Sequence, residues 1–246
     1  MGGQVNTNST LGSSNFDGST QSTVKVNATA GFSITKYTGT GSTATIGHGL
    51  GVAPDVLIVK NRDDTNSWNV YHVGNAGATP AEDFVIYLDQ TSAKVNQSSN
   101  WNDTAPTSSV FTVGSSNGSN GSSDNIIAYC FSSVEGYSKF SSFIGNGQDN
   151  GQYVFLGFRP AWVLIKNSTS GSTDWIIKTD KLQTTNVMNH ALRANTADAE
   201  ATSLSSVDFL ANGMKIRNNG SFTNQDGQTY IYYAFAVQPF KYARAR

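Results

Sequence analysis

Two stretches of the chain share one pattern: LGVAPDVLIVKN at residues 50–61 and LGFRPAWVLIKN at residues 156–167, with an offset of 106 residues. Leu, Gly, Pro, Lys and Asn are identical at this offset, and a four-residue apolar run comes shortly after the proline in both copies. Proline fixes φ and disfavours helix at the residue before it. A short apolar run bounded by turn residues is typical of a strand covered on both faces. Each copy therefore predicts a turn that leads into a buried strand.

The repetition continues on both sides of this motif. The further matches are YTGTG at 37–41 with FIGNG at 143–147, and IIAYCFS at 126–132 with YIYYAFA at 230–236, the latter pair at an offset of 104. Self-similarity at a fixed period is the sequence signature of repeated structural units. We therefore expect an all-β fold of two tandemly duplicated, antiparallel β-sandwich-like units, over residues 31–136 and 137–246.

Residues 1–30 differ from both repeats. They are almost wholly Gly, Ser, Thr, Asn and Gln, and so polar a segment cannot bury enough apolar surface to fold alone. We expect an extended N-terminal arm here, with one short strand over residues 24–27 that pairs with another element. The Ala-rich stretch at residues 186–201 also departs from the strand pattern, and a short helix is left open there.

The charge balance excludes several classes of function. The 246 residues include 16 Lys or Arg and 17 Asp or Glu, and only 13% of residues are charged. Without basic runs the chain is not expected to bind nucleic acid, because phosphate contacts need Lys and Arg. No stretch approaches the ~20 apolar residues of a membrane span, so no membrane partner is expected. The N-terminus lacks the basic and apolar regions of a signal peptide.

Residues that carry catalysis or bind metals are scarce. The chain has three His, and no His-x-Glu, His-Glu-x-x-His or Cys-x-x-Cys spacing, so no catalytic, cofactor or metal site is predicted. Cys130 is the only cysteine; it excludes an intrachain disulfide and is expected inside a strand. The Gly-x-Ser-x-Gly match at residues 114–118 opens a low-complexity loop, not a nucleophile turn. His48 is interpreted as a turn or packing residue, because the second repeat has Tyr-Val-Phe at residues 153–155 in this region and no histidine.

A sugar-binding surface is the one functional site that the sequence suggests. Such sites combine an aromatic face with hydrogen-bond acceptors. The candidate residues are Trp68, Tyr71, Trp101 and Asp103. The alternative is that both tryptophans bury their rings against the sheet. The sequence alone leaves both interpretations open.

Three motifs resemble a domain that is common in virion proteins of tailed phages, particularly marine ones. They lie at residues 39–54, 157–166 and 230–241, and the resemblance covers nearly the whole chain. In that family the domain often closes a longer fibre-like protein, after a concanavalin-like or SPRY-like β domain. The resemblance implies a virion part, such as a tail fibre, a tail appendage or a capsid decoration, and no particular reaction.

The resulting expectation is a non-enzymatic structural protein that is assembled in the host cytoplasm and resides in the extracellular virion. Expected partners are other virion proteins bound through the N-terminal arm, further copies of the chain (a trimer in a fibre), and a host-surface glycan. One alternative is a carbohydrate-binding module without a virion role. Another is a polysaccharide-degrading appendage that uses carboxylates such as Asp63, Asp64, Asp103 or Glu82, although Asp63-Asp64 is better interpreted as a solvated turn. Two carboxyl groups about 5–10 Å apart across a cleft would favour this last alternative.

Overall fold

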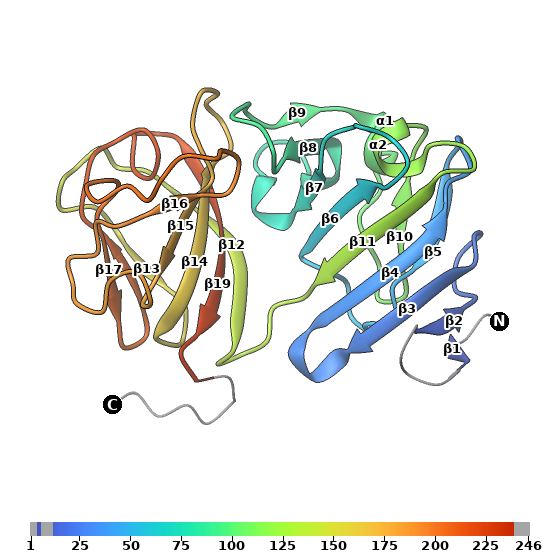
Figure 1. Cartoon of the computed structure of the whole chain (residues 1–246), viewed down its shortest axis with the longest axis horizontal. Helices are drawn as coiled ribbons and strands as arrows, with labels where there is room; N and C mark the ends of the chain where they lie inside the picture. The colour runs from blue at the N-terminus through green and yellow to red at the C-terminus, as the bar shows by residue number, and fades with distance from the viewer. Residues whose placement is uncertain (1–3, 6–11, 239–246) are drawn as a thin grey trace. The chain divides into compact units, whose positions relative to one another are not determined.

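Antiparallel strands account for 41% of the chain and helices for 7%, so the all-β prediction is confirmed. The computed structural model describes residues 4–5 and 12–238 (Figure 1). The described residues form two compact units. Unit 1 comprises residues 4–5, 12–87 and 95–133, and unit 2 comprises residues 88–94 and 134–238.

Unit 1 contains a nine-stranded antiparallel sheet and a two-stranded one. The large sheet has the order β1 (Gln4–Val5), β2 (Ser13–Asn15), β3 (Ser22–Asn27), β4 (Phe32–Thr38), β11 (Asn125–Phe131), β6 (Val56–Asn61), β7 (Asn69–His72), β8 (Phe84–Tyr87), β9 (Val95–Asn96). The small sheet pairs β5 (Ala44–Gly47) with β10 (Val110–Val113). The helical elements are α1 (Ser98–Trp101), α2 (Asn117–Asn120), and the 3-10 turns Ala28–Ala30, Val73–Asn75 and Ala81–Asp83.

The core of unit 1 contains side chains from both of its sheets. Along β11, Ile126, Ala128 and Cys130 are buried, and the residues between them are partly exposed. These three side chains belong to one hydrophobic cluster with Ile46 of β5 and Phe111 of β10. Burial at every second residue is what a sheet with one face on the core requires. Cys130 is buried in a strand, as expected, and burial raises the pKa of its thiol to about 12.

Unit 2 has a five-stranded and a three-stranded antiparallel sheet. The first has the order β12 (Ser138–Ile144), β19 (Thr229–Ala236), β14 (Pro160–Asn167), β15 (Ile176–Thr179), β16 (Leu192–Arg193), and the second the order β13 (Tyr153–Phe155), β18 (Gly213–Ile216), β17 (Val207–Leu210). Val163 and Ile165 of β14 form a buried cluster with Met214 and Ile216 of β18. The cluster again joins two sheets, so each unit is built like a small β-sandwich.

The Ala-rich stretch at residues 186–201 does not form a helix. It contains the two-residue strand β16 and isolated bridges from Met188 to Val207 and from Ala191 to Ala201, and the rest is bend or irregular chain. The side chain of Lys178, from β15, donates to the main-chain oxygens of Met188 and His190. Tertiary hydrogen bonds of this kind override the weak helix preference of alanine-rich sequence.

The large sheets of the two units share one strand order. The order β4-β11-β6-β7 in unit 1 corresponds to β12-β19-β14-β15 in unit 2. Two buried asparagines also make the same turn contacts. Asn120 Oδ1 accepts from Thr40 N at 2.8 Å, and Asn224 Oδ1 accepts from Asn146 N at 3.1 Å. Each Nδ2 also donates to two main-chain oxygens. A tandem duplication would explain these correspondences, and as an evolutionary event it stays a prediction.

The N-terminal segment differs from the extended arm that its composition suggested. Residues 12–27 form the β2–β3 hairpin, and β3 pairs with β4 along six residues. Val24 is buried, and the Ser22 hydroxyl donates to Gly47 O at 2.8 Å. Main-chain pairing, not apolar burial alone, holds this polar segment against unit 1. The expected strand at 24–27 lies inside β3, whereas residues 1–3 and 6–11 of the proposed arm lie outside the described residues.

Candidate functional site

The structure places two of the predicted glycan-binding residues in the core. Tyr71 lies on β7 and Trp101 ends α1, and their side chains are 4% and 1% exposed. Their rings meet edge to face with centroids 6.3 Å apart. The indole Nε1 of Trp101 donates to Phe84 O at 3.1 Å. These rings are therefore not available to a sugar at the surface, and the alternative of burial against the sheet applies to them.

The other two predicted residues lie elsewhere in unit 1. Trp68 is half-buried and stacks on Tyr129 of β11, with ring centroids 6.4 Å apart. Asp103 is exposed in a turn, with a φ of 45°. Neither belongs to the buried cluster of Tyr71 and Trp101. The four residues thus do not assemble into one binding surface.

Two of the acidic candidates for hydrolysis, Asp63 and Asp64, also make local structural contacts. Asp63 Oδ2 accepts from Asn125 N at 2.7 Å and from Asn125 Nδ2 at 2.9 Å, and these hydrogen bonds lower the pKa of its carboxyl group. Asp64 accepts from Thr65 N and from Asn66 Nδ2. Both carboxylates therefore stabilise an exposed turn, as the sequence interpretation held.

His48 is a buried residue, and both of its ring nitrogens contact main-chain atoms. Its side chain is fully buried, with Nε2 3.1 Å from Thr107 O and Nδ1 accepting from Leu50 N at 3.2 Å. Burial lowers the pKa of the imidazole, which favours a neutral ring at physiological pH. Among the described residues, no group of three or more His, Cys, Asp or Glu is placed to hold a metal ion. No helix in the described part of the chain is long and apolar enough to cross a membrane.

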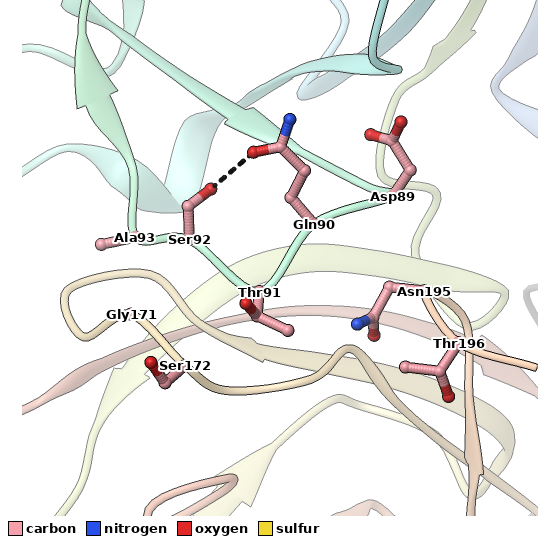
Figure 2. A pocket seen from close by; sticks show the side chains of 9 residues that line it. All are labelled: Asp89, Gln90, Thr91, Ser92, Ala93, Gly171, Ser172, Asn195 and Thr196. Atoms are coloured by element: carbon pink, nitrogen blue, oxygen red, sulfur yellow. Dashed lines mark hydrogen bonds between the residues drawn. The ribbon is translucent and has the colours of Figure 1, made fainter. Parts of the chain in front are cut away.

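A polar pocket of about 610 Å³ lies in unit 2 (Figure 2). Three chain segments, at residues 89–93, 171–172 and 195–196, form its lining. The lining residues are Asp89, Gln90, Thr91, Ser92, Ala93, Gly171, Ser172, Asn195 and Thr196. We refer to this site as the polar pocket.

Main-chain hydrogen bonds hold the first wall of the polar pocket in place. Thr91 O accepts from Thr173 N and from the Lys166 ammonium, both at 3.3 Å. Lys94 N donates to Ser168 O at 2.9 Å at the end of the same loop. Lys166 is fully buried, and burial lowers its pKa to about 8. The loop at 89–93 is therefore fixed through its backbone.

The second wall is held by Asn195. Its Oδ1 accepts from Trp175 N at 2.8 Å, and its Nδ2 donates to Asp174 Oδ1 at 2.9 Å. Arg193 also forms an ion pair with Asp174, Nε to Oδ2 at 2.9 Å. This network ties the loop at 195–196 to the start of β15. Both walls are thus pre-organised by contacts within unit 2.

The lining is rich in uncharged hydrogen-bonding groups. Hydroxyls come from Thr91, Ser92, Ser172 and Thr196, and amides from Gln90 and Asn195. Figure 2 shows the Ser92 hydroxyl directed at Gln90 Oε1, at 3.3 Å. Among the described residues that line the pocket, Asp89 supplies a single carboxylate. Groups that can each donate or accept suit a neutral, hydroxyl-rich ligand.

Sequence reasoning missed this site. Its residues are small and polar, come from three separated segments, and resemble the other turns of the chain. The weak signal in the sequence was Lys166, a lysine at the end of an apolar run. The structure buries Lys166 fully, whereas its counterpart in unit 1, Lys60, is only partly buried. A buried lysine needs acceptors, and here one of them, Thr91 O, belongs to the pocket wall.

Residues 6–239 match the family described as "Domain of unknown function (DUF7483)". No curated protein and no solved structure matches the chain. Because the match extends over nearly the entire sequence, the chain belongs to the DUF7483 family.

Proposed function

We propose that the chain is a non-enzymatic structural component of a tailed-phage virion that attaches to host-surface glycan through the polar pocket. The virion assignment rests on the motifs at residues 39–54, 157–166 and 230–241 and their resemblance to phage virion proteins. The attachment role rests on the lining of the polar pocket, which is the observation that carries the proposal.

The chemistry of the lining supports a sugar as the ligand. A glycan presents hydroxyl groups that both donate and accept, and side-chain hydroxyls and amides can pair with either role. Apart from Asn195, whose amide holds the second wall, the lining places five such side chains around an open volume of about 610 Å³, which is in the range of small-molecule sites. Its near-neutral character also suits a ligand that carries little charge.

The same lining supports binding in preference to cleavage. Glycoside hydrolysis usually needs two carboxyl groups on either side of the scissile bond. Asp89 is the carboxylate of the lining, and the nearby Asp174 is already engaged by Arg193 and Asn195. We therefore propose attachment, and not depolymerisation, as the role of the site.

The virion assignment is tested on particles. An antibody raised against the recombinant chain should label purified phage particles that encode it, at the tail or on the capsid, in immunogold electron microscopy. Label confined to the lysate, with none on particles, would overturn the virion role. Glycan binding without particle label would favour the alternative of a free carbohydrate-binding module.

The glycan role is tested with variants of the polar pocket. A Cβ at Gly171 would meet Ala93 N at 3.8 Å, an ordinary contact, so Gly171→Leu fills the pocket without backbone strain. Gly77→Leu is the matched control, because a Cβ at Gly77 meets nothing within 4 Å. Gln90→Ala removes one amide from the lining, and the exposed Gln148 provides the control Gln148→Ala.

Binding to surface polysaccharide isolated from a susceptible host would be measured by isothermal calorimetry. We expect Gly171→Leu to abolish binding and Gln90→Ala to weaken it about fivefold to tenfold, as the loss of one hydrogen bond predicts. Both controls should bind like the wild type. Equal binding by all four variants would refute the pocket as the site, and release of shortened polysaccharide would refute the non-enzymatic assignment.

A further inference from the structure

Two aromatic rings are exposed on one face of the small sheet of unit 2. Tyr153 and Phe155 are alternate residues of β13, and they are 41% and 57% exposed. Alternate residues of a strand point to the same face and lie about 7 Å apart along it. Val154, between them, points to the opposite face and belongs to the buried cluster of unit 2. The two rings therefore share the outer face of this sheet.

The Tyr153 ring is held over the neighbouring strand. Its hydroxyl donates to Asn212 Oδ1, in the turn between β17 and β18. A Cβ at Gly213 of β18 would lie 2.7 Å from the Tyr153 hydroxyl oxygen and 2.8 Å from Cζ. The outer end of the ring thus lies over a residue that has no side chain. Because the ring is fixed before a ligand arrives, binding to it costs little side-chain entropy.

Two lysines flank the rings. Lys215 of β18 is the register partner of Tyr153 and therefore stands beside it on the outer face. Lys139 of β12 donates to Phe155 O at 2.8 Å, and its Nζ lies 5.3 Å from the centre of the Phe155 ring. Within the described part of the chain, neither ammonium forms an ion pair. Each ring thus has a positive charge beside it.

An acidic side chain lies in the same row, and an arginine already holds it. Asp208 of β17 is the register partner of Lys215 on the other side of β18. Its Oδ2 accepts from Arg217 Nε at 2.5 Å, and its side chain is 5% exposed. The Asp208–Arg217 pair carries no net charge. The charges of Lys215 and Lys139 therefore remain in excess beside the rings.

Unit 1 has no such surface at the corresponding place. Ile46 of β5 holds the core position that Val154 holds in β13, so Thr45 and Gly47 correspond to the two aromatic residues. The N-terminal segment lies against both. Ser19 N donates to Thr45 Oγ1 at 2.8 Å, and a Cβ at Gly47 would collide with that segment. The exposed rings are therefore specific to unit 2 and are not a requirement of the shared strand order.

We propose that this surface, formed by Tyr153, Phe155, Lys139 and Lys215, binds an acidic polysaccharide built from uronic acids. We call it the aromatic patch. The apolar C–H side of a pyranose ring packs on the face of an aromatic ring. A uronic acid carries a carboxylate on the same pyranose, so stacking on a ring brings its negative charge next to a lysine.

Charge complementarity selects this ligand among the alternatives. A neutral glycan would leave both ammonium groups without a counter-charge, and an acidic peptide would not need the faces of the two rings. Nucleic acid binding depends on many phosphate contacts, whereas the aromatic patch supplies two unpaired cations. A polymer of uronic acids can place one sugar on each ring and a carboxylate beside each lysine, so that weak single contacts add up.

The aromatic patch is separate from the polar pocket and shares no lining residue with it. The polar pocket suits a ligand that carries little charge, whereas the aromatic patch requires a negative one. The inference therefore goes beyond the proposed function. Gly171→Leu, which fills the polar pocket, should still bind a polyuronate, and a variant of the aromatic patch should keep an intact polar pocket. Failure of either proposal is thus distinguishable from failure of the other.

The test measures binding of oligomers of polygalacturonate to the full chain by isothermal calorimetry, in low salt and at about 0.3 M NaCl. The matched ligand is the methyl-esterified oligomer, which keeps the sugar rings and removes the charges. Poly-glutamate of equal charge tests whether charge alone is enough.

The variants separate the rings from the charges. Tyr153→Ala and Phe155→Ala each remove a ring, Tyr153→Phe keeps the ring and loses its hydroxyl, and Lys215→Gln removes a charge. Phe16→Ala and Lys25→Gln are the controls, because both side chains are exposed in unit 1. Thermal unfolding confirms that each variant folds.

We expect the wild type to bind polygalacturonate, more weakly at high salt, and to bind the esterified oligomer about tenfold more weakly. Each loss of a ring should raise the dissociation constant about tenfold, and Lys215→Gln should raise it about threefold. Tyr153→Phe and both controls should bind like the wild type.

Three results would overturn the proposal. The first is a wild type that does not bind polygalacturonate, and the second is unchanged binding by both ring variants. The third is equal binding of poly-glutamate, which would identify a surface that responds to charge alone and refute a polysaccharide site. Equal or tighter binding of the esterified oligomer would refute the role of the lysines and with it the acidic class of ligand.

Discussion

Replacement of Lys178 by methionine should remove a pH dependence from the stability of unit 2. Lys178 is fully buried on β15, and its ammonium donates to the main-chain oxygens of Met188, His190 and Leu204. Burial lowers its pKa from the ordinary 10.5 to about 7. In the same loop, the His190 imidazole contacts the Glu200 carboxylate.

The direction of the effect follows from proton binding. Between pH 7 and 10.5 the unfolded chain keeps the Lys178 proton and the folded chain has lost it, so the free energy of unfolding rises with pH. One proton difference is worth about 1.4 kcal/mol per pH unit. From pH 7.5 to 9.5 the wild type should therefore gain about 2–3 kcal/mol of unfolding free energy relative to Lys178→Met. The window lies above the range in which imidazoles usually change charge.

The measurement is urea unfolding of both proteins at intervals of half a pH unit, followed by tryptophan fluorescence. Comparison at each pH cancels the contributions of all other titrating groups. Lys181→Met is the matched control, because the Lys181 side chain is 85% exposed, and its curve should run parallel to the wild type. Parallel curves for wild type and Lys178→Met, within about 0.5 kcal/mol across the window, would refute the reasoning.

Three further predictions concern the core and the turns. Asn120→Ala and Asn224→Ala should each lower the free energy of unfolding by about 2–4 kcal/mol, because each removes a buried amide that bonds one main-chain N–H and two main-chain oxygens; a loss below 1 kcal/mol in urea titrations would contradict this. Trp101→Ala should lower the free energy of unfolding by about 3–5 kcal/mol, because it leaves a cavity in the core. Asp103→Asn, at an exposed turn, should change this free energy by no more than about 0.5 kcal/mol, and thermal unfolding of both variants measures the difference. The Cys130 thiol, whose pKa is raised to about 12, should resist a thiol reagent at pH 8 until denaturant is added, and rapid labelling of the folded chain would be inconsistent with its burial.

Much of the fold was predictable because its signals are local. The apolar runs after Pro54 and Pro160 became β6 and β14, at the middle of each large sheet. The offsets of 106 and 104 also paired β4 with β12 and β11 with β19 in the predicted repeats, and these strands occupy equivalent places in the two sheets. Such short, strongly apolar segments have few alternatives to a buried strand.

The N-terminal segment shows where local signals fail. Residues 12–27 have too few apolar side chains to predict folding, yet β3 pairs fully with β4. Their stability comes from main-chain hydrogen bonds to a sheet that already exists, together with the burial of Val24. A composition argument counts side chains only and cannot see such a partner.

The sequence by itself determined the all-β class, the repeated strand pattern and the burial of Cys130, because each depends on residues that are close along the chain. Only the tertiary structure decided the functional surfaces. It put Tyr71 and Trp101 inside the core, and it gathered the polar pocket from segments about 80 and 25 residues apart. The physical reason is that strand formation follows from local periodicity, whereas a binding surface depends on which loops and edges the long-range pairing of strands brings together.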